Sequence, residues 1–142
     1  MRDTRSLVAT NIERVDIRNS NAADLATEVR SQLLLSGVEI SADADYSLRL
    51  VNEHYNRTVL TVSPVTGKVE EYTMTLTVAL SIGKKGQEEI LANDVITLSR
   101  DYLFDEDALL GKASEENVIR ANLRQQAATA IIRRLNATIN SI

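Results

Sequence analysis

From Tyr46 to Phe104, apolar and polar side chains alternate along most of the chain. A period of two is typical of strands that bury one face of a sheet, and it is incompatible with an amphipathic helix. The alternation is clearest in the middle: Tyr72, Met74, Leu76, Val78, Leu80 and Ile82 have one parity, and Thr73, Thr75, Thr77, Ala79 and Ser81 the other. One face of this strand is therefore predicted to be core, and the other to be small and hydroxylated.

Two shorter alternating runs, 46–51 and 58–62, come before this strand. Pro64, the only proline of the chain, and Gly67 predict a turn between the second run and the long strand. We therefore expect a hairpin whose turn occupies residues 63–68.

A second turn is predicted at 83–86, which contains two glycines and two lysines, and it leads into a last strand over 89–104. In that strand Ile90, Ala92, Ile96, Leu98, Tyr102 and Phe104 share one parity. Asp94 interrupts the apolar parity, which indicates a bulge or a bend near Asn93-Asp94.

The flanking segments have other patterns. Residues 7–12, with Val15 and Ile17, favour an opening strand. The apolar residues that then share one helical face are Ala22, Leu25, Ala26, Val29 and Leu33. Asn21 or Ser20 is expected to cap this helix, and Gly37 to end it with a positive φ.

The closing helix has a narrower apolar stripe, made by Ile119, Leu123, Ala127, Ala130 and Ile131. Glu115 and Glu116 fall in its first turn, where a helix dipole favours acidic groups. The small alanines allow this helix to approach a sheet or the first helix closely. The predicted fold is α+β: a largely antiparallel (mixed) sheet of about four to five strands with two helices on one face. Residues 1–142 are expected to form a single domain.

Composition excludes some functions. The net charge is −4 and the basic residues are dispersed, so nucleic-acid binding is not expected. The longest apolar runs are far shorter than the roughly 20 residues of a membrane-spanning helix. The absence of cysteine removes thiolate nucleophiles, disulfides and thiolate metal sites.

The sequence contains little that indicates a catalytic site. His54 is the only histidine, so a histidine-paired nucleophile or a multi-histidine metal site cannot be assembled, and a surface position is expected for it. Asp101, Asp105, Glu106 and Asp107 form an acidic cluster without the spacing of a calcium loop, and we interpret it as a solvated or salt-bridged loop. No catalytic residue, metal site or cofactor is therefore predicted.

Three segments carry a resemblance to a known family. They are Val29-Arg30-Ser31-Gln32-Leu33 with Gly37-Val38, then Glu71-Tyr72 at the start of the long strand, and finally the series Arg100-Asp101-Tyr102-Leu103-Phe104-Asp105, Leu110-Gly111-Lys112 and Gln126-Ala127-Ala128. In this order and at these separations they resemble the lipopolysaccharide-assembly lipoprotein family LptE. The resemblance covers most of the chain.

The resemblance implies a non-enzymatic role in lipopolysaccharide transport. Members of the family plug the outer-membrane β-barrel LptD, in a 1:1 complex, help to assemble it, and bind lipopolysaccharide on its way to the cell surface. The implied location is the periplasmic side of the outer membrane, within the barrel lumen, with a lipid anchor. The residues after Met1 lack the apolar core of a signal peptide, so we interpret the chain as a mature portion without its export signal and anchor.

The resemblance also suggests ligand-binding residues. Lys112 matches the lysine of the family's Ala-Leu-x-Lys segment and is the first candidate for lipopolysaccharide binding. Lys68 is the second, because the predicted hairpin turn has Pro64-Val65 where a basic residue is expected. Two other hypotheses stay open: a periplasmic adaptor that binds only a protein partner, for example by adding an edge strand, and an enzyme that uses the acidic cluster.

Overall fold

The computed structural model describes residues 12–104 and 112–141, without the side chains of 112–114. The elements follow in the order β1 (Arg14–Ser20), α1 (Ala23–Leu35), β2 (Glu39–Ile40), β3 (Tyr46–Val62), β4 (Val69–Lys84), β5 (Leu91–Leu103) and α2 (Lys112–Asn140). Of the predicted opening strand, residues 7–11 lie outside the described residues, whereas Val15 and Ile17 are buried in β1 as expected.

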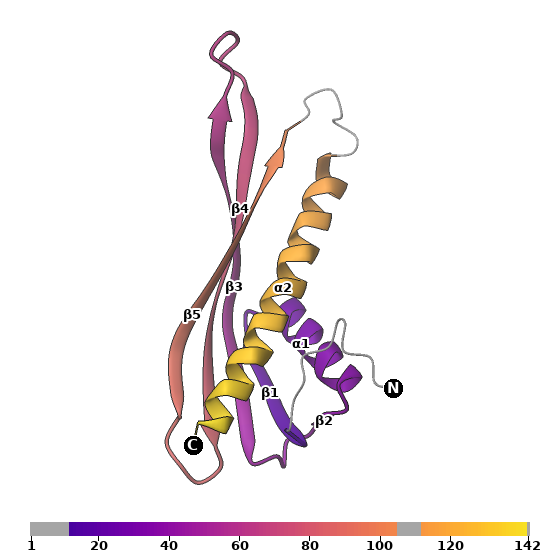
Figure 1. Ribbon diagram of the computed structural model, residues 1–142, viewed down its shortest axis with the longest axis vertical. Helices are drawn as coiled ribbons and strands as arrows, with labels where there is room; N and C mark the ends of the chain where they lie inside the picture. Colours follow the sequence, from indigo (N-terminus) through magenta and orange to yellow (C-terminus); the bar gives the residue numbers. More distant parts are fainter. Residues whose placement is uncertain (1–11, 105–111, 142) are drawn as a thin grey trace.

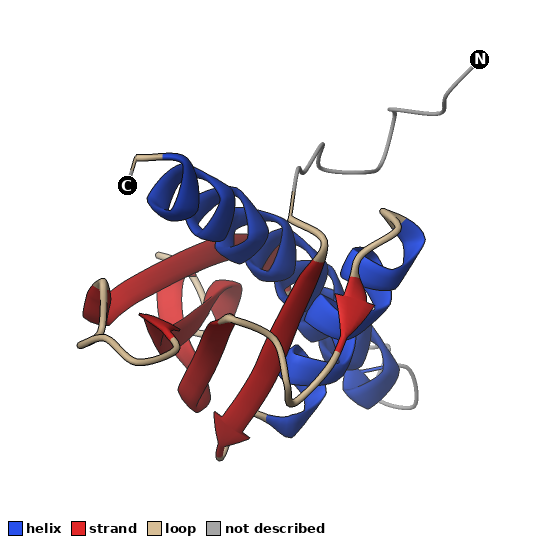
Figure 2. Ribbon diagram, turned by 90° about the horizontal axis from the view of Figure 1, so that it is seen from below, coloured by secondary structure: helices blue, strands red, loops and turns tan. Residues whose placement is uncertain are grey.

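The strands form one sheet in the order β2-β1-β3-β4-β5. β1 is parallel to β2 and β3, and the pairs β3–β4 and β4–β5 are antiparallel. Both helices lie on one side of this strongly twisted sheet, α1 against β1 and α2 against β4 and β5 (Figures 1 and 2). The predicted α+β class, with a mixed sheet and two helices on one face, is confirmed.

The core lies between the sheet and the helices. From the sheet it receives, among others, Leu48 and Leu50 of β3 and the predicted row of β4 from Met74 to Ile82, all at most 1% exposed. The helices contribute Leu25, Val29 and Leu33 of α1, and Leu123, Ala127, Ile131 and Leu135 of α2. Ile96, Leu98 and Tyr102 of β5 are partly buried against this cluster, which confirms the predicted parity for this part of the last strand. Before the irregularity at Asn93 the prediction is wrong, because the register shift reverses the parity: Leu91 packs against the core and Ala92 is exposed.

The prediction of two separate runs before the long strand is wrong, because 46–62 is one strand. The register with β4 shifts between Val51 and His54, where Asn52 has a φ of 58°, and pairing then continues through Val59. An asparagine tolerates this left-handed backbone, so a local irregularity re-phases the alternation without ending the strand. The expected irregularity near Asn93-Asp94 is present: Asn93 has a φ of 53° and the register with β4 shifts between Leu80 and Ile82.

The end of α1 follows prediction but its start does not. Gly37 has a φ of 88°, and Val38 N–H donates to the Leu33 carbonyl, which closes the helix. Ser20 and Asn21 do not cap it: the N-cap is Ala22, whose side chain offers no acceptor. The acceptor comes instead from β3, where Glu53 Oε1 receives the N–H of Leu25 at 2.9 Å. Sequence patterns find local caps, whereas this one is 28 residues away.

The hairpin formed by β3 and β4 extends beyond the helical layer (Figure 1). Its turn and the N-terminal end of α2 lie toward the same end of the molecule, at the top of that view. Within the residues that the structure describes, neither helix combines the length and the apolar character needed to span a membrane.

Candidate functional site

The turn at the tip of the β3–β4 hairpin is held by its own polar groups. Ser63 Oγ accepts the N–H groups of Val65 and Thr66, each at 3.2 Å, and Gly67, with a φ of 72°, donates to the Ser63 carbonyl at 2.9 Å. Lys68 follows directly and is exposed. The structure therefore presents Lys68 at the end of the hairpin.

Exposed apolar side chains lie near Lys68 on the hairpin. Val59, Val62 and Val65 are 54%, 50% and 89% exposed. Residues 58–67 contain no charged side chain, although 25% of the whole chain is charged. A cation beside exposed valines matches the combination that an amphiphilic anion requires.

Lys112 is the first residue of α2, and its side chain lies outside the described residues. What can be placed is the helix that starts there, whose N-terminal end faces the same direction as the hairpin turn (Figure 1). The two predicted lysines thus belong to elements at one end of the molecule. The contact that either makes with a ligand stays a prediction.

A group of polar and aromatic side chains, here the Glu116 cluster, joins α2 to the hairpin below this end. Glu116 Oε2 accepts from Arg57 Nη1 at 2.7 Å and from the Tyr102 hydroxyl at 2.8 Å. The Arg57 guanidinium lies 4.3 Å from the centre of the Tyr72 ring, and Tyr72 stacks on Tyr102 at 5.7 Å. The cluster connects β3, β4 and β5 to the first turns of α2, so it positions the helix start relative to the hairpin.

Burial and the hydrogen bond to Glu116 raise the pKa of Tyr102 to about 12. The same carboxylate, by accepting a hydrogen bond from the guanidinium, raises the pKa of Arg57. Both groups therefore keep their protons at neutral pH. The cluster is therefore a structural contact in which Arg57 and Tyr102 both donate hydrogen bonds to the same carboxylate oxygen.

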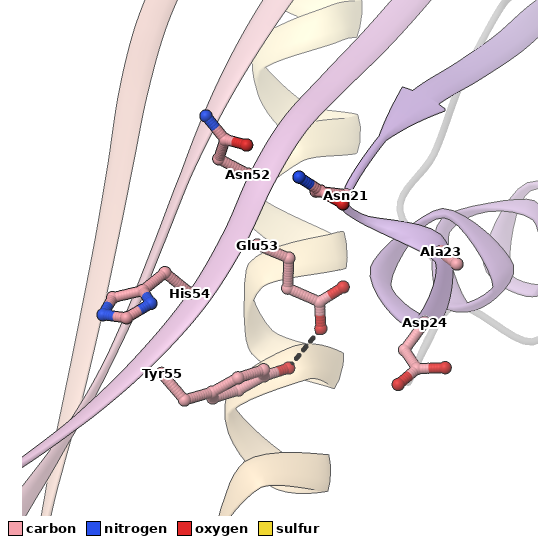
Figure 3. A pocket seen from close by; sticks show the side chains of 7 residues that line it. All are labelled: Asn21, Ala23, Asp24, Asn52, Glu53, His54 and Tyr55. Carbon is pink, nitrogen blue, oxygen red and sulfur yellow. Dashed lines mark hydrogen bonds between the residues drawn. The ribbon is translucent and has the colours of Figure 1, made fainter.

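A second polar group, the Glu53 cluster, joins β3 to both helices. Besides capping α1, the Glu53 carboxylate accepts a hydrogen bond from the Tyr55 hydroxyl through Oε2 (Figure 3). Arg124 of α2 donates to the Tyr55 oxygen at 3.1 Å and lies 4.0 Å from Glu53. The Glu53 side chain is only 6% exposed, and burial together with the bond to Glu53 raises the pKa of Tyr55 above its usual range.

An open hollow of about 630 Å³ lies beside this cluster, lined by Asn21, Ala23, Asp24, Asn52, Glu53, His54 and Tyr55. In Figure 3 the His54 ring points away from Glu53, Asp24 and the start of α1. Glu53 and Tyr55 are already engaged with each other and with the helices. These side chains therefore stabilise the fold, and the hollow brings no nucleophile and base together.

The open face of the sheet carries the predicted hydroxyls. Thr75 and Ser99 share a hydrogen bond at 2.9 Å, and Thr73 donates to Asp101 at 2.6 Å. Ser81 differs from the other hydroxyls of β4, because it is only 6% exposed and its Oγ accepts the Asn93 N–H at the bulge. The threonines thus form a polar external face, whereas Ser81 stabilises the β4–β5 irregularity.

The predicted acidic cluster is only partly described. Asp101 is the acceptor for Thr73, and Asp105, Glu106 and Asp107 lie outside the described residues. Across the rest of the chain that the structure covers, no three histidine or acidic side chains gather where they could hold a metal ion.

Sequence reasoning missed the two polar clusters. Glu116 was interpreted only as an acidic residue in a first helical turn, and Glu53 and Arg57 fell between the predicted strand runs. The signal for Glu53 appears only after the irregularity at Asn52, which gives this charged residue the same parity as the partly buried Tyr55. Such a residue must meet a partner when the strand packs against a helix.

Comparison with known proteins places these features in a family. Residues 11–135 match the family model LptE, described as lipopolysaccharide-assembly. The LPS-assembly lipoprotein LptE of Pectobacterium atrosepticum is 32% identical over 120 residues, which cover 82% of this chain. The chain spans 63% of the length of that relative.

Solved structures share the fold. The crystal structure of rare lipoprotein B from Shewanella oneidensis is similar with a TM-score of 0.81 and 29% identity, covering 91% of this chain and 98% of that one. The solution structure of a lipoprotein B from Nitrosomonas europaea also has a TM-score of 0.81, at 18% identity, over 99% and 92% of the two chains. The chain belongs to the LptE family of lipopolysaccharide-assembly proteins.

Proposed function

We propose that this protein is a non-enzymatic component of lipopolysaccharide assembly in the outer membrane. In this proposal it plugs the LptD β-barrel in a 1:1 complex, helps that barrel to assemble, and binds lipopolysaccharide for delivery to the cell surface. It acts from the periplasmic side, within the barrel lumen, and a lipid anchor holds it at the membrane. The observation that carries the proposal is the family match over residues 11–135.

The hydroxyl groups on the open face of the sheet support a plug. The threonines of β4 give the open face of the sheet small hydroxyls, and the interior of a membrane β-barrel is polar. Hydroxyl groups can donate or accept, so such a face can exchange hydrogen bonds with a polar barrel wall. Three open-face hydroxyls, Thr73, Thr75 and Ser99, are already in side-chain hydrogen bonds, which hold these side chains in defined positions.

The test is co-expression of this chain, with an export signal and anchor sequence supplied, alongside the matching barrel, followed by purification through a tag on this chain. We expect a stoichiometric complex that survives detergent. Recovery of this chain alone would overturn the plug and leave only the shared fold.

Ligand binding is tested by charge reversal. Lys68→Glu combined with Lys112→Glu should weaken lipopolysaccharide binding at least several-fold, since phosphate recognition depends on the two cations. The melting temperature should stay within about two degrees of the wild type, as for other surface substitutions. The control is Lys85→Glu, an exposed lysine in the turn that connects β4 to β5. Unchanged binding in the folded double variant would exclude both lysines as ligand contacts.

The adaptor hypothesis makes a different prediction from the same experiments. An adaptor binds its barrel or another protein partner but shows no saturable binding of lipid A. Titration of labelled lipid A into the wild-type chain therefore separates the two functions, and saturation supports the transport role.

A further inference from the structure

The outer edge of β5 is an exposed strand edge. Among the strands that the structure describes, β5 is last in the sheet and has β4 as its neighbour on one side. The lower half of β5 has no helix or strand beside its outer edge (Figure 1). An uncovered edge of this kind offers a row of backbone donors and acceptors to another strand.

The hydrogen-bonding pattern shows which residues face outward. Phe104 N–H donates to the Glu70 carbonyl at 2.9 Å, and the β4–β5 register is regular from Leu103 back to Asp94. In an antiparallel pair, residues that bond to the neighbour alternate with residues that point away. Even-numbered residues of this segment therefore bond to β4, whereas Val95, Thr97 and Ser99 direct their backbone N–H and C=O groups outward.

This outward segment lacks the usual protection of an edge. Natural edges carry lysines, prolines or bulges that prevent pairing with another chain. Residues 95–99 have no charge and no proline, and the bulge lies before them at Asn93. Val95 is also 59% exposed.

The segment is flanked by one acidic and one basic residue, which would meet each other if two copies paired antiparallel. If a second copy pairs antiparallel with the two-fold axis at Thr97, Asp94 of one copy lies opposite Arg100 of the other. The same register puts Val95 opposite Ser99, and Ile96 opposite Leu98. Moving the axis to Ile96 or Leu98 would place Asp94 opposite an apolar residue or a tyrosine.

The surroundings of Asp94 suit this contact. Its side chain is 26% exposed and already pairs with Arg134 of α2, which fixes the carboxylate near the edge. Arg100 is exposed and contributes the second cation. Opposite charges directly across a strand pair are favourable, and like charges are unfavourable.

We propose that two copies of this chain pair through β5, antiparallel about Thr97, and join their sheets edge to edge. The contact is small, so the dimer is a weak and reversible one. The proposal depends on this strand edge and not on the proposed function: a chain that never binds the barrel can still form the dimer, and the reverse also holds.

Cysteine cross-linking tests the register, because the chain has no cysteine of its own. In the proposed dimer Thr97 of one copy lies opposite Thr97 of the other. Their Cα atoms are then about 5.5 Å apart, a separation that a disulfide can bridge. Thr97→Cys should therefore form a disulfide-linked dimer under mild oxidation. The matched control is Thr77→Cys, because Thr77 is the register partner of Thr97 on the adjacent inner strand. Equal cross-linking of the two variants would indicate random collision and would overturn the proposal.

Sedimentation equilibrium of the cysteine-free chain tests association without a cross-link. We expect concentration-dependent dimerisation in the range of about 0.1–1 mM, typical of a small interface. Arg100→Glu should weaken it about tenfold, because the symmetric dimer then has two like-charged pairs. Arg49→Glu, the same change on the inner strand β3, should leave it unaltered. Self-pairing is overturned if the wild-type chain remains monomeric over this range. It is also overturned if β5 pairs only with a strand of another protein.

Discussion

The Glu53 side chain links strand β3 to both helices. It caps α1, receives the Tyr55 hydroxyl and lies near Arg124, although its own strand is far from the start of α1 in sequence. A buried carboxylate is costly unless its oxygens are satisfied, and here both are. The negative charge also lies at the positive end of the α1 dipole.

Glu53→Gln should therefore destabilise the protein by about 1–3 kcal/mol, because the amide has one acceptor oxygen where the carboxylate has two. Glu88→Gln is the matched control, since Glu88 is exposed in the turn between β4 and β5, and it should change stability by less than about 0.5 kcal/mol. Urea unfolding of both variants gives the comparison. Equal stabilities would mean that the second acceptor oxygen of the carboxylate contributes nothing to the folded state.

The raised pKa of Tyr102 predicts that the protein loses stability at alkaline pH. Its pKa is about 12 in the folded protein, against 10.0 for the ordinary side chain. The folded state then holds the phenolic proton more tightly, so this contribution is complete below pH 10 and is lost as the pH rises toward 12.

The slope of stability against pH between these limits should be shallower in Tyr102→Phe than in the wild type. Tyr46→Phe is the control, because Tyr46 lies at the other end of the sheet, away from Glu116. Denaturant unfolding at a series of pH values measures the slope. An unchanged slope in Tyr102→Phe would show that Tyr102 titrates like an exposed tyrosine.

At the scale of elements, α2 shows why small residues lie at the centre of its buried face. Ala127 and Ala128 are completely buried between the sheet and α1. Gln32 of α1 bonds to the Gln125 carbonyl at 3.2 Å and accepts from Thr129 at 3.0 Å, so the helices touch at this point. A larger side chain would separate them and break these hydrogen bonds.

Ala127→Leu should destabilise the protein by about 1–3 kcal/mol through overpacking. Gln126→Leu adds a leucine at the neighbouring exposed position and should have an effect within about 0.5 kcal/mol. Thermal unfolding distinguishes them. A neutral Ala127→Leu would mean that the helices can move apart freely.

The elements that could be predicted from the sequence are those whose signals are local. The parity of β4 and the glycine that ends α1 required only neighbouring residues. The cap of α1 and the pairing of Glu116 with Arg57 could not be predicted, because each joins residues that only the tertiary fold brings together. For the same reason β2, whose strand is two residues long, has no periodicity to detect. The candidate lysines came from the family resemblance, and their roles stay predictions.

At the scale of the whole molecule, stability should fall along the β3–β4 hairpin from the core to its tip. Leu48, Leu50 and Leu80 are fully buried beneath the helices, whereas Val62 and Val65 near the turn are at least half exposed. Segments with few buried contacts open locally at low free energy.

Hydrogen exchange should therefore be slow for the amides of 74–82 and at least a hundredfold faster for those of 63–69, a difference of about 3 kcal/mol in opening free energy. Residue-resolved exchange by NMR measures both segments in one sample, so the core serves as the internal reference. Uniform protection along the hairpin would show instead that the tip opens only when the entire sheet unfolds.

The position of α2 has a consequence for the protein's synthesis. The face of α1 that carries Leu33, and the inner faces of β4 and β5, are covered by a helix that ends at Asn140. Ribosomes deliver the chain from its N-terminus, so α1 and the sheet emerge before the helix that covers them, and this core can close only when α2 has followed. A message truncated before the codon for Ile119 would lack the buried face of α2 from Ile119 to Leu135, and its product would expose the apolar rows of the sheet to chaperones and proteases.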